Sequence, residues 1–168
     1  MAGQPGGSTG GGGTGPAARR AARLLVVNAE GRVLLFSGSD PSAPHLGRWW
    51  FTPGGGLEGD EDEAAAGRRE LFEETGLEAR DLGPVVHRQH ASFDLDGRHF
   101  EQDEVFFAVR VDRSEVDESR RTEFERRFVH GHRWWSEPEL ASTTEVVFPA
   151  GLLSVLRRAG VFSRAPRV

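Results

Sequence analysis

Apolar side chains occur along the chain in short runs separated by glycine, proline and aspartate, which is the pattern of strands joined by turns. The expected strands span residues 23–28, 32–36, 48–52, 84–95, 99–111 and part of 129–136. The first two are joined by a short loop that contains Gly31, and the two longest are joined at Asp96-Gly97, a strong hairpin signal. The pattern therefore predicts a sheet that contains two hairpins.

Helical composition with clear stop signals appears at 61–75 and at 149–159. Gly76 is a suitable C′ residue for the first of these helices, and Asp60 is its expected N-cap. Residues 136–139 resemble a capping box, which predicts a further short helix, and 113–127 are expected to form a loop with partial helix. Strands interleaved with helices predict a layered α/β (α+β) domain.

Composition divides the chain into three parts. Residues 1–19 are rich in glycine and small polar residues and cannot bury enough apolar surface to offset their ordering, so we expect a flexible tail. Residues 20–162 form the expected domain, and 163–168 a short flexible C-terminus. The chain has no apolar run of membrane-spanning length and no export signal, so we expect a cytoplasmic protein without membrane association. The net charge of −5 argues against stable nucleic-acid binding.

Three glutamates crowd the end of the helix expected at 61–75. Glu70, Glu73 and Glu74 are three and four residues apart, so they project within roughly 100° of arc on one helical surface. Like charges at this spacing destabilise a helix, and its C-terminal end disfavours anions. A bound divalent cation removes both problems, because Mg²⁺ prefers carboxylate oxygen and shares its coordination with substrate phosphates. The glycines at 54–56 let the backbone approach a ligand, which makes a carbonyl there a candidate further metal ligand.

Residues 55–77, GGLEGDEDEAAAGRRELFEETGL, resemble the Nudix box. That signature sets glycines, glutamates, one arginine and two apolar residues at fixed spacing. Every fixed position is met, by Gly55, Glu61, Arg69, Glu70, Leu71, Glu73, Glu74, Gly76 and Leu77. The surrounding strands also follow the family's order, so the resemblance to Nudix hydrolases reaches from about residue 20 to residue 159.

The resemblance implies an α/β/α sandwich around a mixed β-sheet. It also implies Mg²⁺- or Mn²⁺-dependent hydrolysis of a diphosphate bond in a nucleoside diphosphate linked to another group. By position, the residues that resemble metal ligands are Glu70, Glu73, Glu74 and, through its carbonyl, Gly54. Arg69 resembles the orienting arginine, and Glu61 the glutamate at the helix start. The general base stays open, with candidates Glu70 and Glu73 on the helix and Glu123 and Glu125 in the downstream loop.

The substrate depends on residues outside the box. The chain has no Tyr, and it lacks the proline expected of the ADP-ribose group, which favours a nucleoside triphosphate or a modified nucleotide. Most of the tryptophans are expected to pack in strands, with stacking on a base kept open for Trp50, Phe51 and Trp135. Arg48 is a candidate for phosphate contact. Glu101, Asp103 and Glu104 are expected to be charges at a strand edge, with a position facing the metal site kept open for Glu104.

Two alternatives differ in function. A Nudix-fold regulator would bind a nucleotide without cleaving it, although such proteins usually have degraded boxes. An isoprenoid diphosphate isomerase would need an active-site cysteine, and the chain has none. The expected partner is a nucleotide-type small molecule, and a homodimer is left open.

Overall fold

The computed structural model describes residues 18–163. Most of the expected tail and the last five residues lie outside this range, and the first strand starts at Arg19, one residue before the expected domain boundary. The strands are β1 (Arg19–Val27), β2 (Val33–Ser39), β3 (Arg48–Phe51), β4 (Gly54–Gly56), β5 (Val85–Leu95), β6 (Arg98–Arg110), β7 (Val129–Trp135) and β8 (Val146–Phe148). The helices are α1 (Glu63–Thr75), α2 (Glu123–Phe128), α3 (Glu137–Ser142) and α4 (Leu152–Arg158), with a 3-10 turn at Pro44–Leu46.

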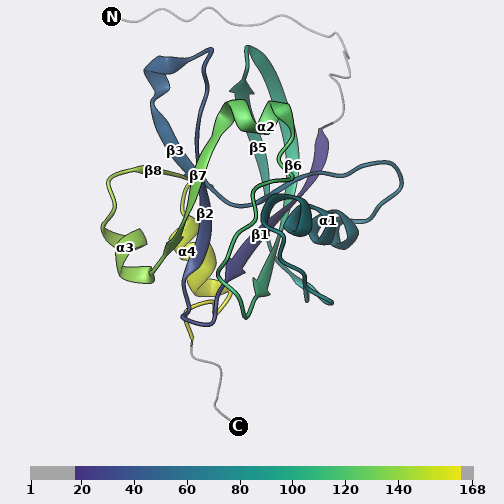
Figure 1. The fold of residues 1–168 in the computed structure, drawn as a ribbon, viewed down its shortest axis with the longest axis vertical. Coiled ribbons are helices and arrows are strands. Elements are labelled where there is room, and N and C mark those ends of the chain that lie inside the picture. Colours follow the sequence, from purple (N-terminus) through teal and green to yellow (C-terminus); the bar gives the residue numbers. More distant parts are fainter. Residues whose placement is uncertain (1–17, 164–168) are drawn as a thin grey trace, which may run out of the picture.

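The strands form one mixed sheet. Its order is β5-β6-β1-β2-β3-β8, with β4 paired to β1 and β7 paired to β2. The β1–β6 and β3–β8 pairs are parallel and the others antiparallel. In Figure 1 the strands β2, β3 and β7 fan away from β1, β5 and β6, so the sheet is strongly curled. The sheet thereby presents two distinct faces to the helices.

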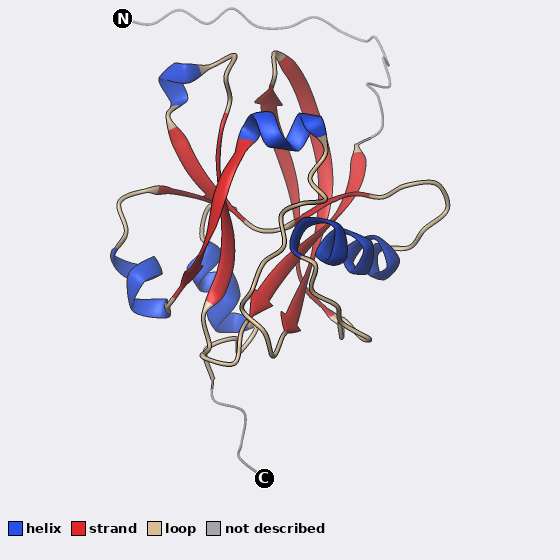
Figure 2. Cartoon of the chain, in the orientation of Figure 1, coloured by secondary structure: helices blue, strands red, loops and turns tan. Residues whose placement is uncertain are grey.

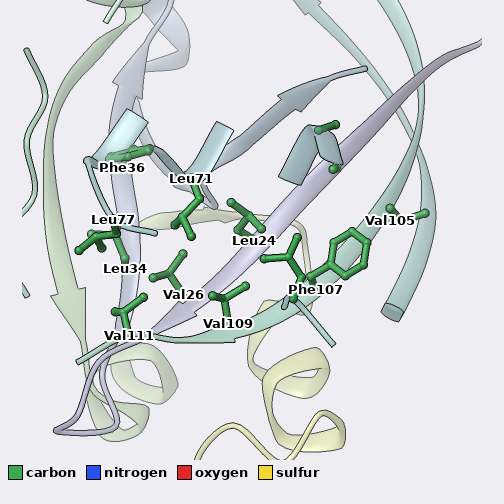
Figure 3. Packing of buried hydrophobic residues seen from close by; sticks show 13 residues of the cluster. Leu24, Val26, Leu34, Phe36, Leu71, Leu77, Val105, Phe107, Val109 and Val111 are labelled. Atoms are coloured by element: carbon green, nitrogen blue, oxygen red, sulfur yellow. The ribbon is translucent and has the colours of Figure 1, made fainter. Parts of the chain in front are cut away.

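Each face of the sheet carries its own hydrophobic core, because successive side chains of a strand point to opposite sides. On one face, Leu24 and Val26 of β1 pack with Leu71 of α1 and with side chains of β2 and β6 (Figure 3). On the other face, Leu25 and Val27 pack against helices α3 and α4. Helices on both faces make an α/β/α sandwich, which confirms the expected fold class (Figure 2).

The start of helix α1 differs from the expectation. Its N-cap is Asp62, whose Oδ1 accepts a hydrogen bond of 2.7 Å from the Ala65 amide, so the assignment of this role to Asp60 was wrong. The end is confirmed, because Gly76 caps it in the left-handed conformation with φ of 68°. The apolar side chain of Phe72 is 39% exposed. The helix instead buries Glu70 and Glu74.

Two capping boxes fix the short helices that follow the long hairpin. Thr122 and Glu125 cap α2 reciprocally, and Ser136 and Glu139 do the same for α3. Helix α2, which falls mostly in the segment expected to form a loop with partial helix, lies above α1 in the view of Figure 1. Within residues 18–163, no helix combines the length and hydropathy that a membrane span needs.

Candidate metal and active site

Helix α1, strand β4 and helix α2 bring three carboxylates together. Glu70 and Glu74 point from α1 toward the sheet and are only 8% and 9% exposed. Glu125 reaches the same place from α2, and single carboxylate oxygens of the three residues all lie within 4.8 Å of one another. One oxygen of Glu125 accepts the capping hydrogen bonds from Thr122, at 2.7 Å from its amide. The helix cap therefore limits how the Glu125 carboxylate can turn.

Arg69 organises the side of α1 that faces solvent. Its guanidinium binds both oxygens of Glu61, at 2.6 and 3.2 Å, and donates to the Gly56 carbonyl at 3.0 Å. It also donates to Glu70 at 3.0 Å and to Glu73 at 3.2 Å. The Glu73 side chain is 51% exposed and does not belong to the cluster of three. Arg69 thus connects the helix start to Glu70 and holds Glu73 at the rim.

Strand β4 lies so close to α1 that only glycine fits. A Cβ built on Gly55 would lie 2.3 Å from Oε1 of Glu70. The Gly54 amide donates to Oε2 of Glu74 at 2.7 Å, and Gly54 has a φ of +129°. The backbone of β4 thus approaches the two buried glutamates closely, as the glycine run indicated.

Burial and mutual repulsion disfavour the charged forms of the two inner glutamates. Burial, followed by the charge of Glu70, raises the pKa of Glu74 well above its usual value, against the opposing effects of the Gly54 amide and Arg23. Burial also raises the pKa of Glu70, although the hydrogen bond from Arg69 opposes it. Mg²⁺ and Mn²⁺ bind hard oxygen donors such as carboxylates, and a bound cation would offset the repulsion between the two buried charges. Glu70, Glu74 and Glu125 therefore fit a divalent cation, and the amide of Gly54 in β4 lies beside Glu74.

Comparison with known proteins agrees with this geometry. The model of the NUDIX domain family matches residues 17–154, which is most of the chain. The chain belongs to the Nudix family. The box identified in the sequence thus forms the β4–α1 unit that carries the buried glutamates.

Relatives of this Nudix protein include a curated RNA pyrophosphohydrolase from Erythrobacter litoralis, 32% identical over 110 residues. The alignment covers 59% of this chain, which spans 65% of the length of that relative. The MutT protein of Methanosarcina mazei Go1 superposes with a TM-score of 0.62 at 22% identity, covering 84% of this chain and 91% of its own. The NUDIX domain of Shewanella oneidensis NrtR, complexed with ADP ribose, gives 0.57 at 17% identity, covering 85% and 88%. At these identities the two structures support the fold alone.

The residues expected to bind substrate lie on both faces of strand β3. Phe51 packs on the α1 side, with its ring centroid 6.0 Å from that of Phe36. Trp50 lies on the opposite face, edge-on to Trp135 at 5.1 Å. Arg48 is exposed and, by the alternation of the strand, lies on the same face as Trp50. In the Nudix protein, Phe51 therefore shares a face with the carboxylate cluster, whereas Trp50 and Arg48 do not.

Two of the remaining sequence expectations concern carboxylates. Glu123 is exposed on α2 and lies outside the cluster that contains Glu125. Glu104 is not a strand-edge charge, because it is 5% exposed and pairs with Arg23 at 2.8 Å. Sequence reasoning missed Arg23, although an arginine inside an otherwise apolar strand was a readable signal.

The raised pKa values of Glu70 and Glu74 predict how the metal-free Nudix protein responds to pH. A carboxyl whose pKa is raised on folding favours the protonated native state, so stability falls as pH rises from the usual pKa of 4.5 through the raised one. A tenfold change in the protonation equilibrium of one carboxyl corresponds to about 1.4 kcal/mol of unfolding free energy. We expect thermal melting in EDTA to show a lower Tm at pH 8 than at pH 5.5, and Mg²⁺ to recover most of the loss.

A matched variant separates this effect from others in the same pH range. His90 and His99 also have raised pKa values, caused first by hydrogen bonds to Asp103 and Asp94 respectively, and their contribution is likewise lost as pH rises. Glu74→Gln removes the buried charge and leaves both histidines. In EDTA, the Tm of Glu74→Gln should fall less between pH 5.5 and pH 8 than the Tm of the wild type. An equal fall in the two proteins would contradict the assignment of this effect to the glutamates.

Proposed function

We propose that the protein is a divalent-cation-dependent pyrophosphohydrolase that cleaves a diphosphate bond in a nucleoside diphosphate linked to another group. The observation that carries the proposal is the convergence of Glu70, Glu74 and Glu125, with single carboxylate oxygens within 4.8 Å and two of the three side chains buried. Membership of the Nudix family supports the same reaction class. The ion would be held by Glu70, Glu74 and the Gly54 carbonyl, with Glu125 beside it.

When bound there, a divalent cation supplies charge neutralisation at the diphosphate oxygens and makes water more acidic. Residues of the chain bind the ion and remove the proton from water. Glu125 has one oxygen fixed by Thr122 and is the only cluster member outside the box, so we assign it the removal of the proton from the attacking water. Glu70 and Glu74 serve as the inner metal ligands. Because Glu73 is half exposed and paired with Arg69, we assign it a contact at the rim of the site.

Arg69 acts by positioning. It touches Glu61, Glu70 and Glu73 and the Gly56 carbonyl, and so fixes the helix start, one inner ligand and the glycine strand relative to one another. On the sheet side of the cluster, Phe51 is the aromatic residue of β3 that is available to a nucleotide. The lack of Tyr, and of the proline expected of the ADP-ribose group, favours a nucleoside triphosphate or modified nucleotide as substrate. The curated relative, an RNA pyrophosphohydrolase, adds RNA as a second candidate substrate.

The test is a hydrolysis panel with Mg²⁺ and with Mn²⁺. It should cover canonical and oxidised nucleoside triphosphates, ADP-ribose, NADH, dinucleoside polyphosphates, nucleotide sugars and a short 5′-triphosphate RNA. We expect turnover of at least one member that is lost in EDTA and restored by the metal. If the protein binds nucleotides by calorimetry but hydrolyses none of them, the regulator without hydrolysis is the better function.

A further inference from the structure

A polar cluster lies within the sheet on the face opposite helix α1. Its members come from β1, β5 and β6, and are Arg19, Arg23, Gln89, Gln102 and Glu104. Arg23 shares this face with Leu25 and Val27, which lie further along β1 under α4. At this point the face changes from apolar to polar, yet Gln102 and Glu104 are buried, at 0% and 5% exposed, whereas Arg23 and Gln89 are half-buried and Arg19 is exposed. A largely buried ion pair between Arg23 and Glu104 therefore calls for an explanation.

Glu104 is the centre of the cluster. It accepts hydrogen bonds from Nε of Arg23 at 2.8 Å, from Gln89 at 2.6 Å and from Gln102 at 2.7 Å. Burial opposes its charge, but Arg23 and these hydrogen bonds outweigh burial and hold the pKa of Glu104 below its usual value. The carboxylate is thus ionised, and the Arg23 guanidinium is fixed against it. A buried ion pair is seldom the more stable choice over apolar side chains of similar volume, so stability alone does not account for it.

The ion pair is connected to the metal site through one peptide. A second nitrogen of Arg23, Nη1, donates to the Gly54 carbonyl oxygen at 3.1 Å. The amide of the same residue donates to Glu74 at 2.7 Å. Gly54 is therefore held from both faces of the sheet, by Arg23 at its oxygen and by a buried glutamate of α1 at its nitrogen.

We propose that Arg23, fixed by Glu104, is a positioning residue that aims the Gly54 carbonyl at the divalent cation. The inference rests on the proposed function, in which this carbonyl is a metal ligand. A carbonyl oxygen has two lone pairs, so one can accept from Arg23 while the other faces the ion. Glycine gives β4 little stiffness of its own, and the Arg23 hydrogen bond supplies the missing constraint.

Glu104 contributes to this arrangement by offsetting the positive charge of Arg23. A lone guanidinium beside the carbonyl would repel a divalent cation, since the two charges would lie a few ångströms apart in a partly buried place. Glu104 cancels that charge at 2.8 Å from Nε of Arg23. The pair therefore presents a hydrogen-bond donor to Gly54 with little net charge near the ion.

The test compares Mn²⁺ affinity, measured by electron paramagnetic resonance on the whole chain, in the wild type and in Arg23→Gln. Residues that orient metal ligands typically contribute about 10- to 100-fold in affinity, and we expect a loss of at least about 10-fold. Arg110→Gln is the matched control, because Arg110 also donates to a backbone carbonyl, that of Val161, at 3.1 Å. It lies at the far end of β6, and its Mn²⁺ affinity should equal that of the wild type.

Glu104→Gln is the second variant, for the case in which Arg23→Gln does not fold. It keeps the side-chain shape and leaves Arg23 uncompensated, so we expect weaker Mn²⁺ binding, because salt screens a partly buried charge only a little. Urea unfolding of each variant gives the stability separately. Folded variants that are less stable but bind Mn²⁺ as the wild type does would show that the pair only holds the sheet together. A wild type that binds no Mn²⁺ would instead overturn the proposed function, and this inference with it.

Discussion

Glu74→Gln should lower hydrolytic turnover at least about 1,000-fold while the protein stays folded. Glu74 is buried, with a carboxylate oxygen within 4.8 Å of those of two other glutamates, and accepts a hydrogen bond from the Gly54 amide, so in the proposed function its charge serves the ion rather than the fold. The amide of glutamine keeps the shape and an acceptor for Gly54, but it loses the anionic ligand. Steady-state kinetics at saturating Mg²⁺, with circular dichroism as the folding check, measures the effect.

Glu73→Gln is the matched control, because it makes the same chemical change one residue earlier in α1. The Glu73 side chain is 51% exposed and is held by Arg69 outside the cluster, so we expect a much smaller loss of turnover. Equal losses in the two variants would contradict the division into inner and rim glutamates. Near-normal rates in both variants would contradict the assignment of a metal site to these glutamates.

Glu125→Gln should lower kcat by about 100- to 10,000-fold, the usual contribution of a general base. Glutamine can replace glutamate in a capping box, so helix α2 should remain intact. Steady-state kinetics at saturating Mg²⁺ measures the loss. Glu123→Gln, two residues away and exposed, should keep the rate. If Glu123→Gln is the damaging change, the proton acceptor has been assigned to the wrong carboxylate.

The regular elements could be predicted because their signals are local. The Asp96-Gly97 turn, Gly76 at the end of α1 and the Ser136 capping box each depend on a few neighbouring residues, and all three occur in the structure. Strand β4 could not be found in this way, since three glycines carry no alternation of side chains. It forms only because Gly54–Gly56 pairs with β1, which is a tertiary event.

In the candidate site, too, some features follow from local sequence signals and others depend on tertiary contacts. The box fixed the identity of Glu70 and Glu74, and helical spacing placed them on one surface. The exposure of Glu73 depends on how α1 is rotated against the sheet, which no spacing within the helix reveals. Likewise, the choice between Glu123 and Glu125 depends on where Thr122 starts α2. The faces of Trp50 and Phe51 follow from the register of β3 against β2, which the sequence of β3 alone does not specify.

Position 54 limits how this protein can be redesigned. A Cβ there would lie 2.1 Å from the Ala22 carbonyl oxygen at a φ of +129°, and the amide and carbonyl are both already engaged. In a library randomised at this codon, only glycine codons should survive selection for activity. An engineer who wants a new nucleotide preference should therefore leave the glycine strand untouched and diversify β3. There the side chains alternate between the two faces without entering the carboxylate cluster.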